Sequence, residues 1–182
     1  PHTPLHAPPS RLHTRSLSGD PEDSPVEHLQ AAVGAMDSEL GRLLAAVDLE
    51  RATVFFIGAN GTVGKAPDEP FLPHRAQGTV YEGGINVPWI VAGAGVRTRG
   101  TECTGLVNTT DLFATVAELA GVTSSAEDSV SLVPYFTDPG QPSLRRWVYA
   151  ERFRPKLERL IGPLVRRVAY RKFTDRDRVH GE

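Results

Sequence analysis

The side chains best placed for chemistry lie in the loop between two predicted strands, at residues 53–58 and 87–92. Glycines in this loop permit tight turns that other residues resist. In an open α/β sheet, a ligand usually binds just past the carboxyl ends of the strands. Amide groups there can donate hydrogen bonds, and side-chain oxygens can bind a hard cation. We therefore expect the functional positions to be Ala59, Asn60, Gln77 and Glu82.

The two strands are predicted from their composition. Residues 53–58 (TVFFIG) are rich in β-branched and aromatic residues, as expected for a buried strand that is covered on both faces. Residues 87–92 (VPWIVA) repeat this pattern, and Pro88 fits only near the start or edge of a strand.

A long helix is predicted to begin at Ser24. Ser24 is a suitable N-cap, Pro25 suits the first helical position, and Glu27 completes a capping box. An apolar stripe at helical spacing follows and should pack on the sheet. It consists of Val26, Leu29, Val33, Met36, Leu40, Leu43, Leu44 and Val47.

The rest of the chain predicts one more helix and two more strands. Thr109 or Thr110 should cap a helix that ends at Gly121, with Asp111 at its positive N-terminal end. Its apolar face would consist of Leu112, Phe113, Val116 and Leu119. Residues 147–153 and 166–173 are predicted strands, and the proline-rich residues 1–23 form an irregular loop.

Length and composition indicate one globular domain. The chain has 182 residues, 40% of them hydrophobic and 23% charged, and no apolar run of about 20 residues that could span a membrane. A single cysteine excludes an internal disulfide framework and leaves the compartment open.

Charge is unevenly distributed. The net charge is −2, but residues 145–182 contain 12 Lys/Arg and 5 Asp/Glu. A nucleic-acid patch is one reading of this basic tail, but no aromatic interleaving or known binding module supports it. A solvated surface is favoured, and no nucleic-acid partner is expected.

Several blocks together resemble the C-terminal part of the catalytic domain of type I sulfatases, in the alkaline phosphatase superfamily. They are residues 58–62 (GANGT), 78–88 (GTVYEGGINVP), 92–96 (AGAGV), 107–113 (VNTTDLF), and the opening PHTP. The resemblance implies a partial α/β domain, a mixed sheet with packed helices, over residues 1–182. It also implies that the N-terminal half is absent and that the basic tail 152–182 leads towards a C-terminal subdomain.

The resemblance assigns roles to four positions. His2 corresponds to a histidine that contacts the sulfate group. The family motif Asp-Asn-Gly binds calcium or magnesium, and here Asn60 is retained whereas the aspartate position is Ala59, so the cation site is weakened or lost. A sulfate-contacting lysine is replaced by Gln77. Without the resemblance, Asn60-Gly61 would be read as a plain tight turn.

The resemblance also sets expectations about activity. Cys103 does not lie in the C/S-x-P/A-S-R motif that yields the formylglycine nucleophile, so the nucleophile is expected in a half of the domain that precedes Pro1. A fragment of a sulfate-ester hydrolase is the first hypothesis, with a sulfated small molecule or glycan as substrate. The alternatives are a degenerate, non-catalytic relative that binds a ligand or protein, and a related phosphodiesterase or phosphonate hydrolase. The missing half would be a further partner, and without it we expect an exposed sheet edge and poor stability.

Overall fold

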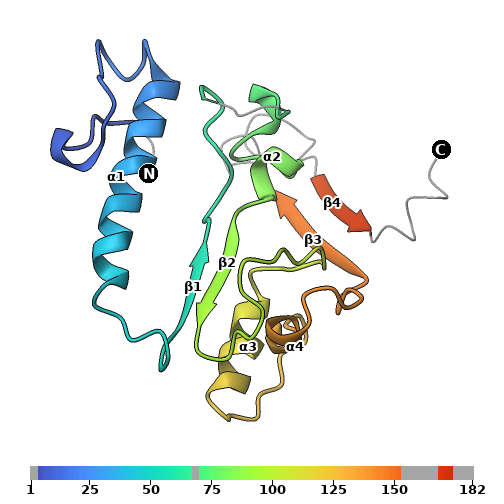
Figure 1. The fold of residues 1–182 in the computed structure, drawn as a ribbon. Helices are drawn as coiled ribbons and strands as arrows, with labels where there is room; N and C mark the ends of the chain where they lie inside the picture. Colours follow the sequence, from blue (N-terminus) through green and yellow to red (C-terminus); the bar gives the residue numbers. More distant parts are fainter. Residues whose placement is uncertain (1–3, 67–69, 153–167, 174–182) are drawn as a thin grey trace. The chain divides into compact units, whose positions relative to one another are not determined.

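A computed structural model describes residues 4–66, 70–152 and 168–173, the last range as backbone only (Figure 1). The described elements form two compact units, and each is presented by itself. Unit 1 comprises residues 1–52 and 56–90; unit 2 comprises residues 53–55 and 91–182. No helix in the described ranges combines the length and apolar character that crossing a bilayer requires.

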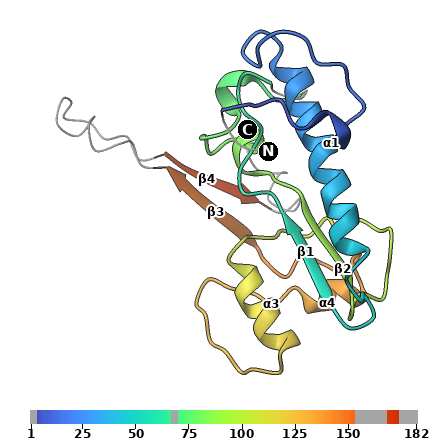
Figure 2. The ribbon, with the colours of Figure 1, turned by 90° about the vertical axis from the view of Figure 1, so that its left-hand side faces the viewer.

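Helix α1 (Pro25–Leu44) is the longest element of unit 1, and it starts where the sequence predicts. Its buried residues are His28, Ala31 and Ala35, which share one face. This face packs against the N-terminal segment that contains the 3₁₀ helix η1 (Ser10–Leu12), which lies beside α1 in Figure 2. Ser38 Oγ donates to the Leu12 carbonyl at 3.0 Å. Small residues allow this close approach of two backbones.

The predicted apolar stripe of α1 is therefore not the buried face. Val26 is 42% exposed and Val33 is 44% exposed, and the described element that α1 contacts most is η1. The reason is that an amphipathic pattern shows which face can be buried, whereas the segment that reaches the helix decides which face is covered.

The predicted capping box is also wrong. Ser24 is the N-cap but makes no capping hydrogen bond, because its hydroxyl donates to the Ser18 carbonyl at 3.1 Å and contacts His28 Nδ1 at 3.1 Å. The Ser24 amide donates to the Asp20 carbonyl at 3.2 Å, so it needs no bond from Glu27.

Because Ser24 makes these contacts and Glu27 does not form the capping box, substitutions of the two residues should change the free energy of unfolding by different amounts. Ser24→Ala should lower the free energy of unfolding by about 1 kcal/mol, because it removes hydrogen bonds beside the buried His28. Glu27→Ala should cost less than about 0.5 kcal/mol, as is usual for exposed positions without a specific partner. Urea denaturation of both variants tests this; equal losses would instead support the box.

Strands β1 (Thr53–Ile57) and β2 (Trp89–Gly93) form a two-stranded sheet, and both lie where the sequence predicts. They run antiparallel, as Figure 1 shows, since Thr53 Oγ1 donates to the Ala94 carbonyl and the Gly58 amide donates to the Pro88 carbonyl. All five residues of β1 are half-exposed, so the expectation of a buried strand covered on both faces is wrong for the described residues.

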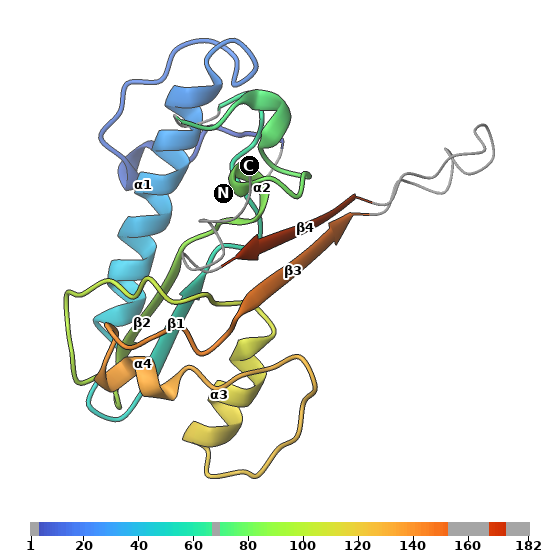
Figure 3. The same cartoon turned by 90° about the vertical axis from the view of Figure 1, so that its right-hand side faces the viewer.

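Unit 2 contains α3 (Asp111–Leu119), α4 (Val133–Thr137), β3 (Trp147–Arg152) and β4 (Val168–Phe173). β3 and β4 pair antiparallel, with Trp147 opposite Phe173 and Arg152 opposite Val168 (Figure 3). These strands confirm the two predicted near the end of the sequence. The α/β class is confirmed as well, although the parallel pairing that a mixed sheet requires does not occur among the described strands.

The core of unit 2 combines apolar residues with a buried polar network. Leu106, Leu132, Tyr135 and Phe136 are buried, and the rings of Phe55 and Phe136 lie 6.3 Å apart. Asp111 and Thr115 are fully buried on α3. The predicted apolar face of α3 stays outside, because Phe113 is 59% exposed.

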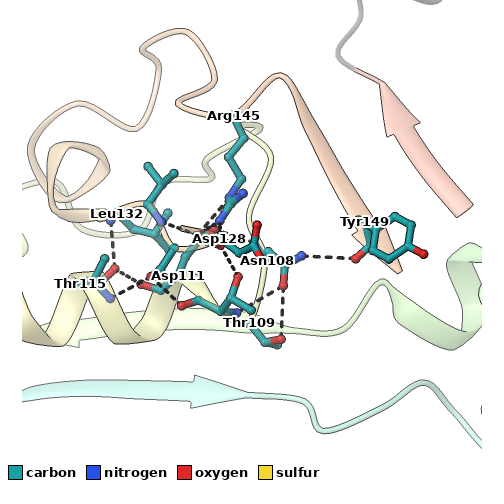
Figure 4. A network of polar contacts seen from close by, with 12 residues as sticks. Asn108, Thr109, Asp111, Thr115, Asp128, Leu132, Arg145 and Tyr149 are labelled. Atoms are coloured by element: carbon teal, nitrogen blue, oxygen red, sulfur yellow. Dashed lines mark hydrogen bonds and ion pairs between the residues drawn. The ribbon is translucent and has the colours of Figure 1, made fainter. Parts of the chain in front are cut away.

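The polar network joins α3 to the segments that precede and follow it (Figure 4). The Asp111 carboxylate accepts hydrogen bonds from the Asn108 and Val130 amides, both at 2.8 Å, and from Arg145 Nε and Nη2. Thr115 Oγ1 donates to the Asp111 carbonyl and accepts from the Leu132 amide. The buried face of α3 is therefore held by hydrogen bonds and an ion pair of Asp111 and Thr115, where most helices bury apolar side chains.

At the ends of α3, the sequence predicts the terminal residues correctly but not the capping hydrogen bond at the N-terminus. The N-cap is Thr110, as expected, but it makes no capping bond, and its hydroxyl donates to the Asp128 carbonyl at 2.8 Å. The Thr110 amide instead donates to Asn108 Oδ1 at 3.2 Å. Gly121 follows the helix with φ of +68°, a conformation that favours glycine, which confirms the predicted end.

Candidate functional site

The candidate site lies at the edge of unit 1 where β1 ends and β2 begins. The loop over residues 58–88 leaves β1 and returns to the same edge, because the Gly58 amide donates to the Pro88 carbonyl at 2.9 Å. The Gly61 amide donates to the Gly84 carbonyl at 3.1 Å, which extends the pairing beyond the strands. An antiparallel pair therefore brings residues 59–62 and 82–88 together.

Glycines make this close approach possible. A Cβ atom on Gly61 would lie 1.9 Å from the Gly83 carbonyl oxygen, and one on Gly84 would lie 2.3 Å from the Thr79 carbonyl oxygen. Gly83 and Gly84 are buried in the short helix α2 (Glu82–Ile85). Both clashes are with backbone, so a side chain at Gly61 would displace the turn that carries Asn60, and one at Gly84 would displace the backbone at Ala76 and Thr79, which flank Gln77.

Asn60 and Gln77, two of the predicted site residues, are in direct contact. Gln77 Nε2 donates to Asn60 Oδ1 at 2.8 Å, and the Gln77 amide donates to the Thr62 carbonyl at 2.9 Å. Asn60 is exposed and Gln77 is half-buried, so the pair lies at the surface with one side chain anchored by its backbone. Ala59 is exposed beside Asn60.

The remaining polar side chains of interest are Glu82, His74, Cys103 and His2. Glu82, one of the expected functional positions, accepts at Oε2 from Asn86 Nδ2 at 3.0 Å within the α2 turn. His74 is exposed in the 3₁₀ helix η2 (Pro73–Arg75). Cys103 is exposed in unit 2. His2 lies outside the described residues.

Sequence reasoning missed one arrangement in this loop. The guanidinium of Arg75 lies over the ring of Tyr81, 4.9 Å from its centroid, which is a favourable cation–π distance. Six residues separate the two in an irregular segment, and no periodic pattern identifies such a pair. The contact fixes Arg75 within the loop that carries Gln77.

The donor set of this site does not fit a divalent cation. Calcium and magnesium prefer several oxygen ligands, some of them charged. Ala59 supplies no side-chain oxygen, and Asn60 Oδ1 already accepts from Gln77. Within the described ranges, no three His, Cys, Asp or Glu residues are grouped as a metal site would require. The residues at this edge are suited to hydrogen bonding rather than to cation binding.

Comparisons with known proteins agree on one family. The sulfatase family model matches residues 1–122. The crystal structure of a candidate sulfatase from Bacteroides thetaiotaomicron superposes with a TM-score of 0.53 at 26% sequence identity. The match covers 69% of this chain but only 27% of that chain. No curated protein gives a significant match.

Proposed function

This chain belongs to the sulfatase family, and we propose that it forms part of the site at which a hydrolase of that family binds sulfate esters. The contact that carries the proposal is the 2.8 Å hydrogen bond between Gln77 and Asn60. It joins two positions, 17 residues apart, that the family resemblance assigns to sulfate and cation binding. The match covers 27% of the solved candidate sulfatase, so the activity of the whole protein is part of this proposal.

The chemistry of these side chains suits an oxyanion. A carboxamide NH₂ group donates hydrogen bonds to sulfate oxygens, and it does so without a net charge. An ammonium group in the same place would stabilise both the bound anion and the charge that develops as the ester bond breaks. Gln77 is therefore expected to position the sulfate group and to contribute less to the rate than a lysine would.

The test is hydrolysis of 4-nitrophenyl sulfate by the protein at its natural length. Gln77→Lys should raise kcat/KM by at least about tenfold, since a single charged or well-placed donor commonly changes rates by one to three orders of magnitude. Gln30→Lys adds the same charge on the exposed face of α1 and should leave kcat/KM unchanged. Unchanged binding and turnover in both Gln77→Lys and Gln77→Ala would refute the proposal. A phosphodiester and a phosphonate ester, assayed in parallel, test the related hydrolase activities.

A second candidate function is sulfated-ligand binding without turnover. Ala59 and Gln77 favour it, because together they remove one anionic cation ligand and one cationic sulfate contact. The natural protein would then bind 4-nitrophenyl sulfate but not hydrolyse it, and Ala59→Asp combined with Gln77→Lys would increase hydrolysis strongly. High activity of the unmodified protein would exclude this candidate.

A further inference from the structure

The Asn60–Gln77 pair can be compared with the cation site that the family resemblance implies at the same place. Its three positions are all uncharged: Ala59 is apolar, and Asn60 and Gln77 are neutral amides. Calcium requires roughly six to eight oxygen ligands, and its affinity depends on how many of them are charged. At the three motif positions, the described side chains offer oxygens from two neutral amides, and one of those oxygens accepts a hydrogen bond from the other amide.

Other described carboxylates do not repair this deficit. Glu82, a described acidic residue within the loop over residues 58–88, accepts a hydrogen bond from Asn86 at 3.0 Å. Glu22 forms an ion pair with Lys65. The search for groups of three potential ligands among the described residues finds none.

We propose that this edge of the chain has exchanged a cation site for a hydrogen-bonded amide pair, and that it holds an oxyanion without a divalent cation. The hydrogen bond from Gln77 keeps Asn60 in place, which is a role that a shared cation would otherwise fulfil. The Asn60 Nδ2 group still has N–H donors to offer to an anion. The identity of the anion as a sulfate rests on the proposed function, whereas the independence from cations rests on the donor set of the residues that the structure describes.

The experiment measures cation binding and anion binding separately, on the protein at its natural length. First, melting temperature is recorded in EDTA and in excess CaCl₂ or MgCl₂. A ligand that binds only the folded state raises the melting temperature, so we expect a change of less than about 1 °C in the natural protein. Ala59→Asp should introduce a rise with CaCl₂, since it adds a charged oxygen ligand next to Asn60.

Second, calorimetry measures the affinity for inorganic sulfate and 4-nitrophenyl sulfate under the same conditions. The affinity should agree within about twofold between EDTA and CaCl₂, while Asn60→Ala should weaken it at least about tenfold by removing a direct donor and the partner of Gln77. A calcium-dependent melting temperature in the natural protein that Asn60→Ala abolishes would overturn the inference. Absence of sulfate binding under every condition would refute the proposed function, and the melting-temperature result would still decide the question of the cation.

Discussion

Replacement of Asp111 by alanine is expected to lower the free energy of unfolding by about 3–5 kcal/mol, the range found when one partner of a buried ion pair is removed. Asp111 is fully buried, and only 12% of the Arg145 side chain is exposed. The substitution would leave the guanidinium without its counter-charge, and the Asn108 and Val130 amides without their acceptor. All three losses occur in the same desolvated place, which is why the effect is large.

Urea denaturation of the natural-length protein measures this loss, with Asp128→Asn as the matched control. Asp128 contributes its backbone carbonyl to Arg145 and Thr110, so changing its side chain should cost less than about 0.5 kcal/mol. If Asp111→Ala does not fold, Thr115→Val provides a milder test. It removes the hydroxyl that accepts from the buried Leu132 amide at 2.9 Å and should cost about 1–3 kcal/mol. Losses below about 0.5 kcal/mol in both variants would mean that the network does not stabilise unit 2.

The positions of α1, α3 and the four strands could be predicted from the sequence because local patterns determine them, whereas no pattern predicts the short helices α2 and α4. Pro25 marks the first residue of α1, and Gly121 ends α3 with a positive φ. The apolar runs at residues 53–57 and 89–93 are strands. Each of these features depends on residues that are adjacent in the chain, and none requires knowledge of the tertiary fold.

The buried faces could not be predicted in the same way. Ala31 and Ala35 are buried on α1 because the N-terminal segment packs there, and no sequence pattern within the helix predicts this contact. On α3, Asp111 is buried by virtue of Arg145, which lies 34 residues further along the chain. Hydrophobic periodicity identifies the helix face that could be buried. The face that is buried can be a different one, where a buried ion pair forms or where a loop packs on small residues.

The candidate site falls between these two cases. Its proposed residues could be named in advance, because the resemblance of the sequence to the family motifs singles out Asn60 and Gln77. Their contact could not be derived from spacing, since it depends on where the loop over residues 58–88 returns to the sheet. Backbone hydrogen bonds at Gly58 and Gly61 set that return, and they leave no periodic signal in the sequence.

Gly61→Ala is therefore expected to have the largest effect on the site itself. The new Cβ would lie 1.9 Å from the Gly83 carbonyl oxygen, and 2.8 Å from the Gly84 Cα, so the backbone of one turn must move. We expect a loss of about 3 kcal/mol in the free energy of unfolding, at the upper end for overpacking, since no flexible side chain can yield. The Gly61–Gly84 hydrogen bond and the neighbouring Asn60–Gln77 contact should be lost together.

Two measurements separate this local effect from general destabilisation. Hydrogen exchange should accelerate in peptides covering residues 58–88, while peptides from α3 keep their protection. The affinity for 4-nitrophenyl sulfate should fall at least about tenfold in parallel, because Asn60 no longer meets Gln77. Gly41→Ala is the matched control: a Cβ on Gly41 meets nothing within 4 Å, so the added methyl should stabilise α1 slightly and leave binding unchanged. Retention of both exchange protection and affinity in Gly61→Ala would show that the glycine contact does not position Asn60, and the amide pair would then have to be held by Gln77 and Thr62 alone.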